Sequence, residues 1–307
     1  MTKTWITPIL GMPEGDFKKV RRSMVKEEER LLTLTGDYQC GRLTTPNMKT
    51  VRMSGRSFED WVCTNHSEVT ANVSDLIRDP ANEGAWFMAA SQLNCLEMIS
   101  PDITPEDGIG CYAQDFTQGP AVAMATGAAT LARNYLYQTP NNQINLGAYL
   151  FRALSEMTGA QFPVINGYAL PSGKALMAAA DYLNACSPND IWSLMESIQI
   201  GLHRRAGVTD RQHTVNLSLC SAMPVAYSGL APELWKPLAM LFLKASYIST
   251  LAAAHFDART GGSNVVYLTW LGGGAFGNPQ AWIVEALWYA LDQFEFAGLD
   301  VRMVNYG

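Results

Sequence analysis

The sequence predicts an α/β fold, because strands and helices alternate over the last third of the chain. Residues 212–222, 264–271 and 299–304 have the composition of strands. Residues 235–255 and the segment from 280 onward repeat apolar side chains at helical spacing. Parallel strands need a crossover connection, so this order of strand, helix, strand, helix and strand favours parallel pairing.

The segments before this region complete the predicted order of elements. The mixed charges of residues 17–30 indicate a solvated helix or lead-in segment rather than a basic patch. Residues 31–35 and 41–53 are predicted as short strands, and residues 85–90 as an interior strand. Further along, we expect a proline-punctuated loop over 100–108, a helix of small residues over 121–134, a strand or hairpin arm over 164–170, and helices over 174–186 and 189–201.

A glycine-rich loop, Gly272-Gly-Gly-Ala-Phe-Gly-Asn-Pro279, separates the strand at 264–271 from the helix that follows it. Glycines let backbone N–H groups approach a phosphate closely, and a helix start adds unpaired donors and a positive dipole end. Pro279 suits the first turn of that helix. The alternative is a tight turn without a ligand, but three adjacent glycines followed by Phe and a fourth glycine favour an anion site.

Composition limits the classes of partner. The chain has 307 residues, is 48% hydrophobic and carries a net charge of −6, so neither nucleic acid nor an anionic membrane is expected as the main partner. No signal peptide or membrane-spanning run is recognisable, and we expect a cytoplasmic protein. Nothing in the sequence indicates an oligomeric state.

Metal and cofactor sites find no support in the sequence. The six cysteines form no CxxC pair, which argues against a zinc ribbon and a disulfide framework, and we interpret them as buried thiols. No histidine pair has the spacing of metal ligands. We therefore predict neither a metal ligand nor a cofactor, and a single domain at 1–307 with an N-terminal extension (about 1–60) and an inserted helical segment (about 139–211).

The segment from Leu268 to Pro279, with its following helix and final strand, resembles the second phosphate-binding loop of macrodomains and the Gly-rich Ala-Phe-Gly segment of poly(ADP-ribose) glycohydrolases. Upstream, Phe87-Met-Ala-Ala-Ser-Gln-Leu-Asn94 resembles the strand that ends in the ligand-binding Asn of this superfamily. The chain also departs from the pattern. Macrodomains have a glycine-rich first loop after the Asn, and the glycohydrolases carry paired glutamates after theirs, whereas this chain has Cys95-Leu-Glu-Met98 and then only Gln118-Gly-Pro120.

The resemblance implies a three-layer α/β/α macrodomain-like mixed sheet that binds ADP-ribose or a related NAD-derived ligand. The glycine loop would hold the diphosphate and distal ribose, with Phe276 beside the ribose, and Asn94 would bond a ribose hydroxyl. The turn at Gln118 would form the opposite wall. The candidate ligand-binding residues are Gln92, Asn94, Thr117, Gln118, Gly119, Gly272, Gly273, Gly274, Ala275, Phe276, Gly277 and Asn278.

If the protein is a hydrolase, an acid near the anomeric carbon must assist the leaving group or activate water. The candidates are Glu97, Glu106, Asp107 and Asp115. Each also has a structural interpretation: Glu97 as a surface residue after the strand, Glu106 and Asp107 as caps of a turn, and Asp115 as the cap of the next helix.

Two other functions remain open. A non-catalytic sensor or sponge for an NAD-derived nucleotide would need the binding loops without a placed acid. A dinucleotide-dependent oxidoreductase is the less favoured alternative, since Gly272, Gly274 and Gly277 fit the G-x-G-x-x-G pattern and Asp300 lies near the expected distance. Such a domain needs further strands after the acid, and the sequence stops at Gly307.

Overall fold

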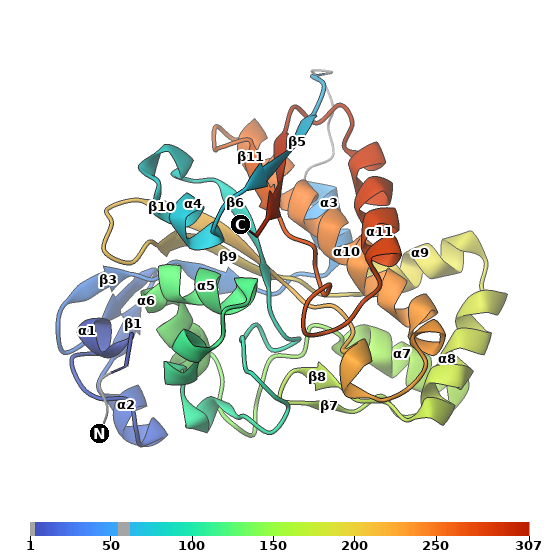
Figure 1. The fold of residues 1–307 in the computed structure, drawn as a ribbon, viewed down its shortest axis with the longest axis horizontal. Coiled ribbons are helices and arrows are strands. Elements are labelled where there is room, and N and C mark those ends of the chain that lie inside the picture. Colours follow the sequence, from blue (N-terminus) through green and yellow to red (C-terminus); the bar gives the residue numbers. More distant parts are fainter. Residues whose placement is uncertain (1–3, 55–61, 307) are drawn as a thin grey trace.

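The computed structural model describes residues 4–54 and 62–306, so part of the predicted N-terminal extension lies outside the described residues. Its centre is a seven-stranded mixed sheet, shown in Figure 1. The strands, in spatial order, are β4 (Arg42–Thr44), β9 (Gly201–Gly207), β10 (Thr214–Cys220), β6 (Trp86–Ala90), β11 (Val265–Leu268), β12 (Asp300–Asn305) and β5 (Asn65–Thr70).

The predicted alternation over the last third of the chain is confirmed. It consists of β10, α10 (Pro232–Arg259), β11, α11 (Gln280–Gln293) and β12. Strand β6 lies between β10 and β11, and the strands from β10 to β5 all pair in parallel, whereas β4 and β9 pair antiparallel at the other edge. The carboxyl ends of β10, β6 and β11 therefore meet at one edge of the sheet, where α/β proteins bind ligands.

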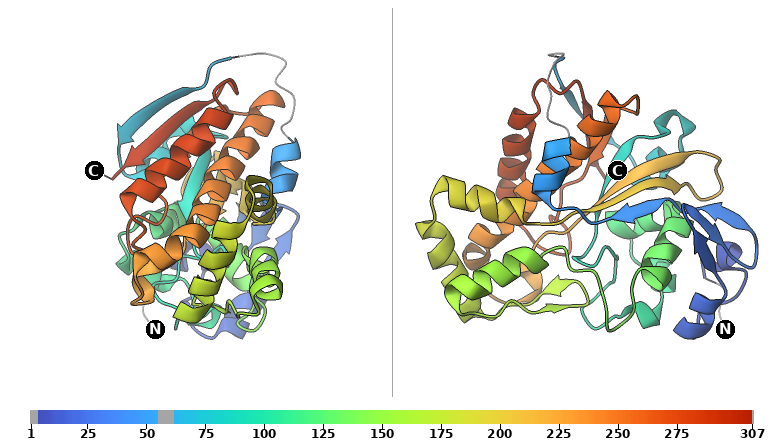
Figure 2. Two further views of the ribbon diagram at one scale, coloured as in Figure 1. Left: turned by 90° about the vertical axis from the view of Figure 1, so that its right-hand side faces the viewer. Right: turned by 180° about the vertical axis from the view of Figure 1, so that it is seen from behind.

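Helices cover both faces of the sheet, which makes the three layers that the sequence resemblance implies. On one face, α3 (Met48–Ser54), α8 (Gly173–Ala185), α9 (Pro188–Glu196) and α11 pack around α10. On the other face, α4 (Val73–Arg78), α5 (Gln118–Ala125) and α6 (Gly127–Leu131) pack in sequence. Figure 2 shows α3 and α10 toward the viewer when the molecule is seen from behind, with α5 and α6 beyond the sheet.

The N-terminal residues form a second, smaller core beside this sandwich. It includes α1 (Thr7–Leu10), α2 (Phe17–Arg22) and a three-stranded sheet of β1 (Val25–Glu27), β2 (Arg30–Leu32) and β3 (Asp37–Gln39). The partly buried carboxylate of this segment's Glu14 accepts hydrogen bonds from the N–H groups of Ile109 (2.9 Å) and Gly110 (2.6 Å) and from the Tyr135 hydroxyl (2.6 Å). The N-terminal segment is thus fastened to the part of the chain that follows β6.

The segment at 139–211 contains α7 (Ala148–Thr158), the hairpin of β7 (Val164–Ile165) and β8 (Tyr168–Ala169), α8 and α9. It also contains β9, which belongs to the central sheet, where the sequence predicted the end of a helix over 189–201. The alternation of apolar and polar residues expected of a strand is obscured in β9, because two of its polar residues, His203 and Arg204, make their contacts within the protein. His203 is fully buried, and the Arg204 guanidinium pairs with Asp257 (3.2 Å) and lies over the Trp86 ring.

Two further predictions are corrected. The strand predicted over 41–53 ends early, because α3 begins at Met48, and Asn47 Oδ1 accepts a hydrogen bond from the Thr50 N–H (2.9 Å) as a helix cap does. The six cysteines are not uniformly buried thiols: Cys40, Cys95 and Cys220 are buried, Cys111 and Cys186 are partly buried, and Cys63 is exposed.

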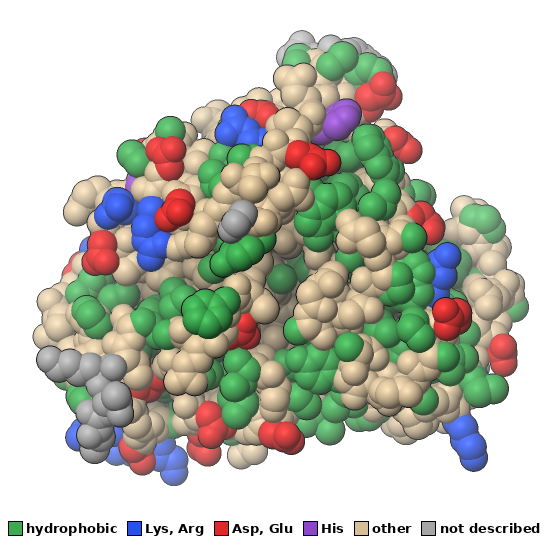
Figure 3. All heavy atoms as spheres, in the orientation of Figure 1, with side chains coloured by type: hydrophobic (Ala, Val, Ile, Leu, Met, Phe, Trp, Pro, Cys, Tyr) green, Lys and Arg blue, Asp and Glu red, His purple; other side chains and the backbone are tan. Residues whose placement is uncertain are grey.

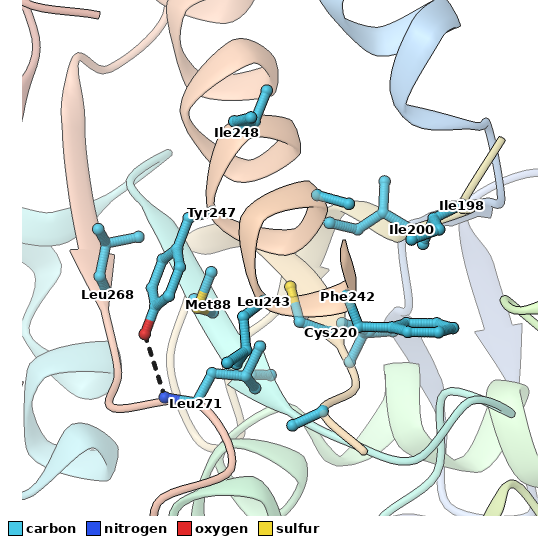
Figure 4. Packing of buried hydrophobic residues seen from close by; sticks show 14 of the residues in the cluster. Met88, Ile198, Ile200, Cys220, Phe242, Leu243, Tyr247, Ile248, Leu268 and Leu271 are labelled. Carbon is cyan, nitrogen blue, oxygen red and sulfur yellow. Dashed lines mark hydrogen bonds between the residues drawn. The ribbon is translucent and has the colours of Figure 1, made fainter. Parts of the chain in front are cut away.

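Helix α10 is the centre of the main core. By length and composition it could cross a membrane, but 89% of its most apolar window is buried inside the protein, as in the core helix of a globular fold. Figure 4 shows its side chains packed against β6, β10 and β11. Among them, the Tyr247 hydroxyl donates to the Thr269 carbonyl oxygen (2.8 Å) and accepts from the Leu271 N–H (3.2 Å), so α10 fixes the point where β11 becomes the glycine loop.

Candidate functional site

A pocket opens at the carboxyl ends of β6, β10 and β11 and encloses about 720 Å³ of space, counting the part open to solvent at its mouth. Figure 3 shows this face hollowed near its middle. Its walls come from the residues after β6, the start of α5, the hairpin residue Tyr168, the residues after β10, and the glycine loop. Three of these segments, the residues after β6, the start of α5 and the glycine loop, are the ones that the sequence resemblance brings together.

The glycine loop contributes backbone donors to the pocket. Three of its N–H groups bond within the loop region: Gly273 to Trp270 O (3.0 Å), Gly277 to Gly274 O (2.9 Å) and Asn278 to Gly272 O (2.9 Å). In the part of the chain that the structure describes, the N–H groups of the consecutive residues 274–276 donate to no protein acceptor. Successive free amides in a tight loop form the kind of concavity that binds anions.

An aromatic cluster forms the wall beside this loop. The rings of Tyr168, Tyr227 and Phe276 lie 5.1, 5.4 and 5.7 Å apart, centroid to centroid. Phe276 is held in place because its carbonyl oxygen accepts from the Ala226 N–H (3.0 Å). The Tyr168 hydroxyl donates to Met98 O (2.6 Å) and so cannot swing into the pocket without losing that bond. The cluster offers a fixed apolar surface to a sugar or a base.

Glu97 is the buried acid of the pocket. Its side chain is 1% exposed, its Oε1 lies 3.5 Å from Arg133 Nη2, and its Oε2 has no hydrogen-bond partner among the described residues. Burial raises the pKa of Glu97 from 4.5 to about 7, and the charge and hydrogen bond of Arg133 oppose the rise without cancelling it. The side chain can therefore hold and release a proton near neutral pH. Because the side chain is buried, the interpretation of Glu97 as a surface residue is wrong.

The start of α5 lies directly against Glu97. A Cβ atom at Gly119 would stand 2.0 Å from Ala90 O and 3.0 Å from Glu97 Cγ, so only glycine fits there. The Gln118 side chain closes the end of β6, accepting from the Ala90 N–H (2.9 Å) and donating to Met88 O (2.8 Å). The Gln118 and Gly119 N–H groups have no protein acceptor among the described residues, as at a helix start.

Three further predicted residues also line the pocket: Gln92, Thr117 and the acid Asp115. The Gln92 side chain shapes the turn, since its Nε2 donates to Met98 O (3.0 Å) and its Oε1 accepts from the Met98 N–H (2.7 Å). Asp115 Oδ1 accepts from the Thr117 N–H (2.9 Å), but Thr117 is the N-cap of α5 and no side chain of the described residues caps that helix, so the interpretation of Asp115 as the helix cap is wrong. Gly272, Gly274, Ala275 and Phe276 line the opposite side.

Asn94, Glu106 and Asp107 do not line the pocket. Asn94 is fully buried, donates from Nδ2 to Gln143 Oε1 (2.8 Å) and accepts at Oδ1 from the Leu96 N–H (3.2 Å), so it shapes the turn after β6 and does not line the pocket. Asp107 forms a capping box with Thr104, and the neighbouring Glu106 is exposed.

In the glycine loop, three predicted residues likewise lie outside the lining. Gly273 and Gly277 turn the backbone, and Asn278 Nδ2 donates to Met223 O (2.8 Å). The loop thus separates into residues that face the pocket and residues that hold its shape.

Three residues of the site were not singled out from the sequence. Tyr168 and Tyr227 come from connections without a motif, where only their aromatic character could have drawn notice. Arg133 stands in the predicted helix of small residues over 121–134, and an arginine in such a segment is a signal that could have been used, because a buried arginine needs a partner.

The dinucleotide alternative does not fit the topology. Asp300 pairs in register with Val265 at the amino end of β11, whereas the glycine loop leaves the carboxyl end of that strand. Its carboxylate is also engaged by Arg302 (2.6 Å). A ribose-binding acid would have to lie at the same edge of the sheet as the glycines. Within residues 4–54 and 62–306, no three His, Cys, Asp or Glu side chains are grouped as metal ligands.

The sequence matches no known family model, and no curated protein is similar to it. Among solved structures, the chain is similar to poly(ADP-ribose) glycohydrolase from Deinococcus radiodurans in complex with ADP-ribose, with a TM-score of 0.47, 11% identity and 88% of each chain covered. It is also similar to the poly(ADP-ribose) glycohydrolase of Thermomonospora curvata, with a TM-score of 0.45, 15% identity, and 94% of this chain and 90% of that chain covered. The Thermomonospora curvata enzyme bound to the inhibitor ADP-HPD gives a TM-score of 0.42 at 15% identity, covering 94% of this chain and 89% of that chain.

Proposed function

We propose that this pocket binds the ADP-ribosyl group of a nucleotide and that Glu97 is the acid for hydrolysis of its glycosidic bond. The observation that supports this most is the Oε2 atom of Glu97, a buried carboxyl oxygen without a hydrogen-bond partner among the described residues, on a side chain that lines a pocket with free backbone amides. Buried polar atoms are rarely left unpaired, and those that are often belong to functional sites.

The diphosphate would bind through the backbone. No Lys or Arg is among the described residues that line the pocket, so the anion contacts would fall to the N–H groups of residues 274–276 and of the first turn of α5. Loop amides and helix starts are established anion-binding elements. The aromatic cluster of Tyr168, Tyr227 and Phe276 would pack against the apolar face of a ribose.

The hydrolytic step needs one proton donor. Below a pH of about 7, Glu97 is neutral and can donate its proton to the departing oxygen as the bond to the anomeric carbon breaks. Water then adds to the anomeric carbon, and the carboxylate takes the proton that the water loses, which restores the acid. Asp115, the second acid of the pocket lining, would attract the positive charge that develops on the sugar.

Binding is tested by calorimetric titration with ADP-ribose, with NAD and AMP as comparators. The informative variants are at Gly274, where an added Cβ atom meets nothing within 4 Å, and not at Gly273, where it would meet Ile283 Cδ1 at 3.1 Å. Gly274→Glu should abolish binding because its carboxylate repels the diphosphate, and Gly274→Ala should retain it. No saturable binding of ADP-ribose at millimolar concentration would reject the proposal.

Hydrolysis is tested separately, by release of ADP-ribose from ADP-ribosylated substrates. Wild-type turnover that Glu97→Gln lowers by a factor of about 100 or more would support the role of the acid. Binding without turnover by the wild-type protein would instead establish the non-catalytic sensor. Turnover that is unchanged in Glu97→Gln would assign the acid role to another residue, with Asp115 the first to replace.

A further inference from the structure

We infer that Arg133 is the positioning residue of this site: it engages Glu97 through Oε1 and leaves Oε2 as the oxygen that faces the reacting bond. The inference rests on the proposed function of Glu97. The two carboxyl oxygens differ in their surroundings, since Oε1 lies 3.5 Å from Arg133 Nη2 and Oε2 has no hydrogen-bond partner in the described part of the chain. A proton on Oε1 would face a cation, so the proton belongs on Oε2.

Arg133 is itself held on several sides. Its Nε donates to Cys95 O (3.1 Å), its Nη2 donates to Thr130 Oγ1 (3.0 Å), and its side chain is fully buried. Cys95 stands two residues before Glu97 and has a left-handed backbone (φ 61°). Arg133 therefore fixes the turn that presents Glu97 as well as its carboxyl group.

The third support of Arg133 is His203, whose tautomer follows from its partners. His203 Nε2 lies 2.8 Å from Cys40 O, and a carbonyl oxygen can only accept, so Nε2 carries the hydrogen. His203 Nδ1 is then unprotonated and accepts from Arg133 Nη1 (3.5 Å). Burial and the charge of Arg133 lower the pKa of His203 to about 3, so the ring stays neutral while the guanidinium stays charged.

The charge of Arg133 is directed at one carboxyl group. Among the described residues, Glu97 is the single acid within ion-pair distance of it, and the other titratable groups facing Glu97 are Tyr112 and Cys95, both neutral at pH 7 because burial raises their pKa. The Tyr112 hydroxyl accepts from the Glu97 N–H (3.0 Å). Arg133 also lies in a π-helical turn, Ala132–Leu136, a local irregularity that is frequent at functional sites.

A guanidinium at this distance stabilises the carboxylate that remains after proton donation. Without it, the proton would be held more tightly and released at higher pH. An opposite charge this close shifts a carboxyl pKa by about one to three units. Replacing Arg133 by a neutral residue should therefore raise the midpoint of Glu97 ionisation by at least about one pH unit.

The test follows the ionisation of Glu97 directly, by carbon NMR of glutamate carboxyl groups in the ligand-free protein, with Glu97→Gln assigning the signal. Arg133→Met should raise the midpoint of Glu97 ionisation. The matched control is Arg204→Met, which removes a different ion pair and should leave that midpoint unchanged. An unchanged midpoint in a folded Arg133→Met protein would overturn the inference. Because no substrate is needed, this result is independent of whether the protein hydrolyses ADP-ribosyl bonds.

Arg133→Lys tests positioning apart from charge and decides the matter if Arg133→Met does not fold. Lysine keeps the charge but lacks the planar fork that reaches Cys95, Thr130 and His203 together. We expect a Glu97 midpoint close to that of the wild type, with kcat lowered by about tenfold or more and KM little changed. Wild-type kcat and an unshifted pH profile in Arg133→Lys would show that positioning by the guanidinium is not needed, and would overturn the inference.

Discussion

Replacing Glu97 by Gln should stabilise the fold relative to the wild type as the pH rises. The wild-type carboxyl group has a pKa of about 7 in the folded protein, against 4.5 for an ordinary glutamate. Between these values the folded state binds more protons than the unfolded state, so wild-type stability falls as pH rises from 4.5 to 7. Gln does not titrate, so the stability of the Glu97→Gln protein does not fall in this way as the pH rises.

The size of the effect follows from the pKa difference. A difference of about 2.5 units corresponds to about 3 kcal/mol in the free energy of unfolding. The side chain is 1% exposed, so solvent does not screen the effect appreciably. Any constant cost or gain from the amide group shifts the whole curve and does not alter its dependence on pH.

Urea unfolding of both proteins at a series of pH values from 4.5 to 8.5 measures this difference. The stability of Glu97→Gln minus that of the wild type should increase by about 3 kcal/mol over that range and level off above pH 7. Glu106→Gln serves as the control, because Glu106 is exposed and its curve should run parallel to that of the wild type. Parallel curves for Glu97→Gln would refute the burial and charge environment derived for Glu97.

Three further predictions concern residues that support the site. Neutral His203 should contribute about 5 kcal/mol to the free energy of unfolding above pH 6.5, and this contribution should be lost as the pH falls to 3. In urea unfolding, His203→Gln in a Glu97→Gln background should lack that pH dependence. Gly119→Ala, whose Cβ would stand 2.0 Å from Ala90 O, should cost about 1–3 kcal/mol in thermal unfolding; an unchanged transition would contradict this packing. Tyr247→Phe, which removes the hydroxyl bonded to the Leu271 N–H (3.2 Å), should cost about 1–3 kcal/mol and weaken ADP-ribose binding; full affinity would show that the loop does not depend on this anchor.

The sequence predicts the fold best where apolar side chains repeat without interruption. The helix at 235–255 and the strands at 85–90 and 264–271 lie in the core, and burial alone determines their pattern. Strand β9 was missed because His203 and Arg204 break its alternation, and their partners, Cys40 and Asp257, are distant in the sequence. A pattern within one segment cannot reveal pairing with another.

The candidate site shows the same division between features that lie within one segment of sequence and contacts that join distant segments. The glycine loop is local in sequence, so its position beside the pocket could be anticipated. Asn94 has the residue type of a ligand contact, but its amide bonds Gln143, a residue of the connection before α7 that no local pattern links to it. The environment of Glu97 depends on Arg133 and Gly119, and neither spacing nor composition places those residues against the acid.

The charges of the pocket would also make a buried acid compatible with the anionic ligand proposed for it. Glu97 and Asp115 line a space without a Lys or Arg among its described lining residues, so two carboxylates would oppose a diphosphate. A neutral Glu97 removes one of the two negative charges, and the positive charge of Arg133 beside it would attract such a ligand through low-dielectric protein. By linkage, if protonation of Glu97 strengthens the binding of an anionic ligand, binding of that ligand must favour protonation of Glu97 by the same free energy. Binding of the diphosphate would thus prepare the acid in the state that donates a proton.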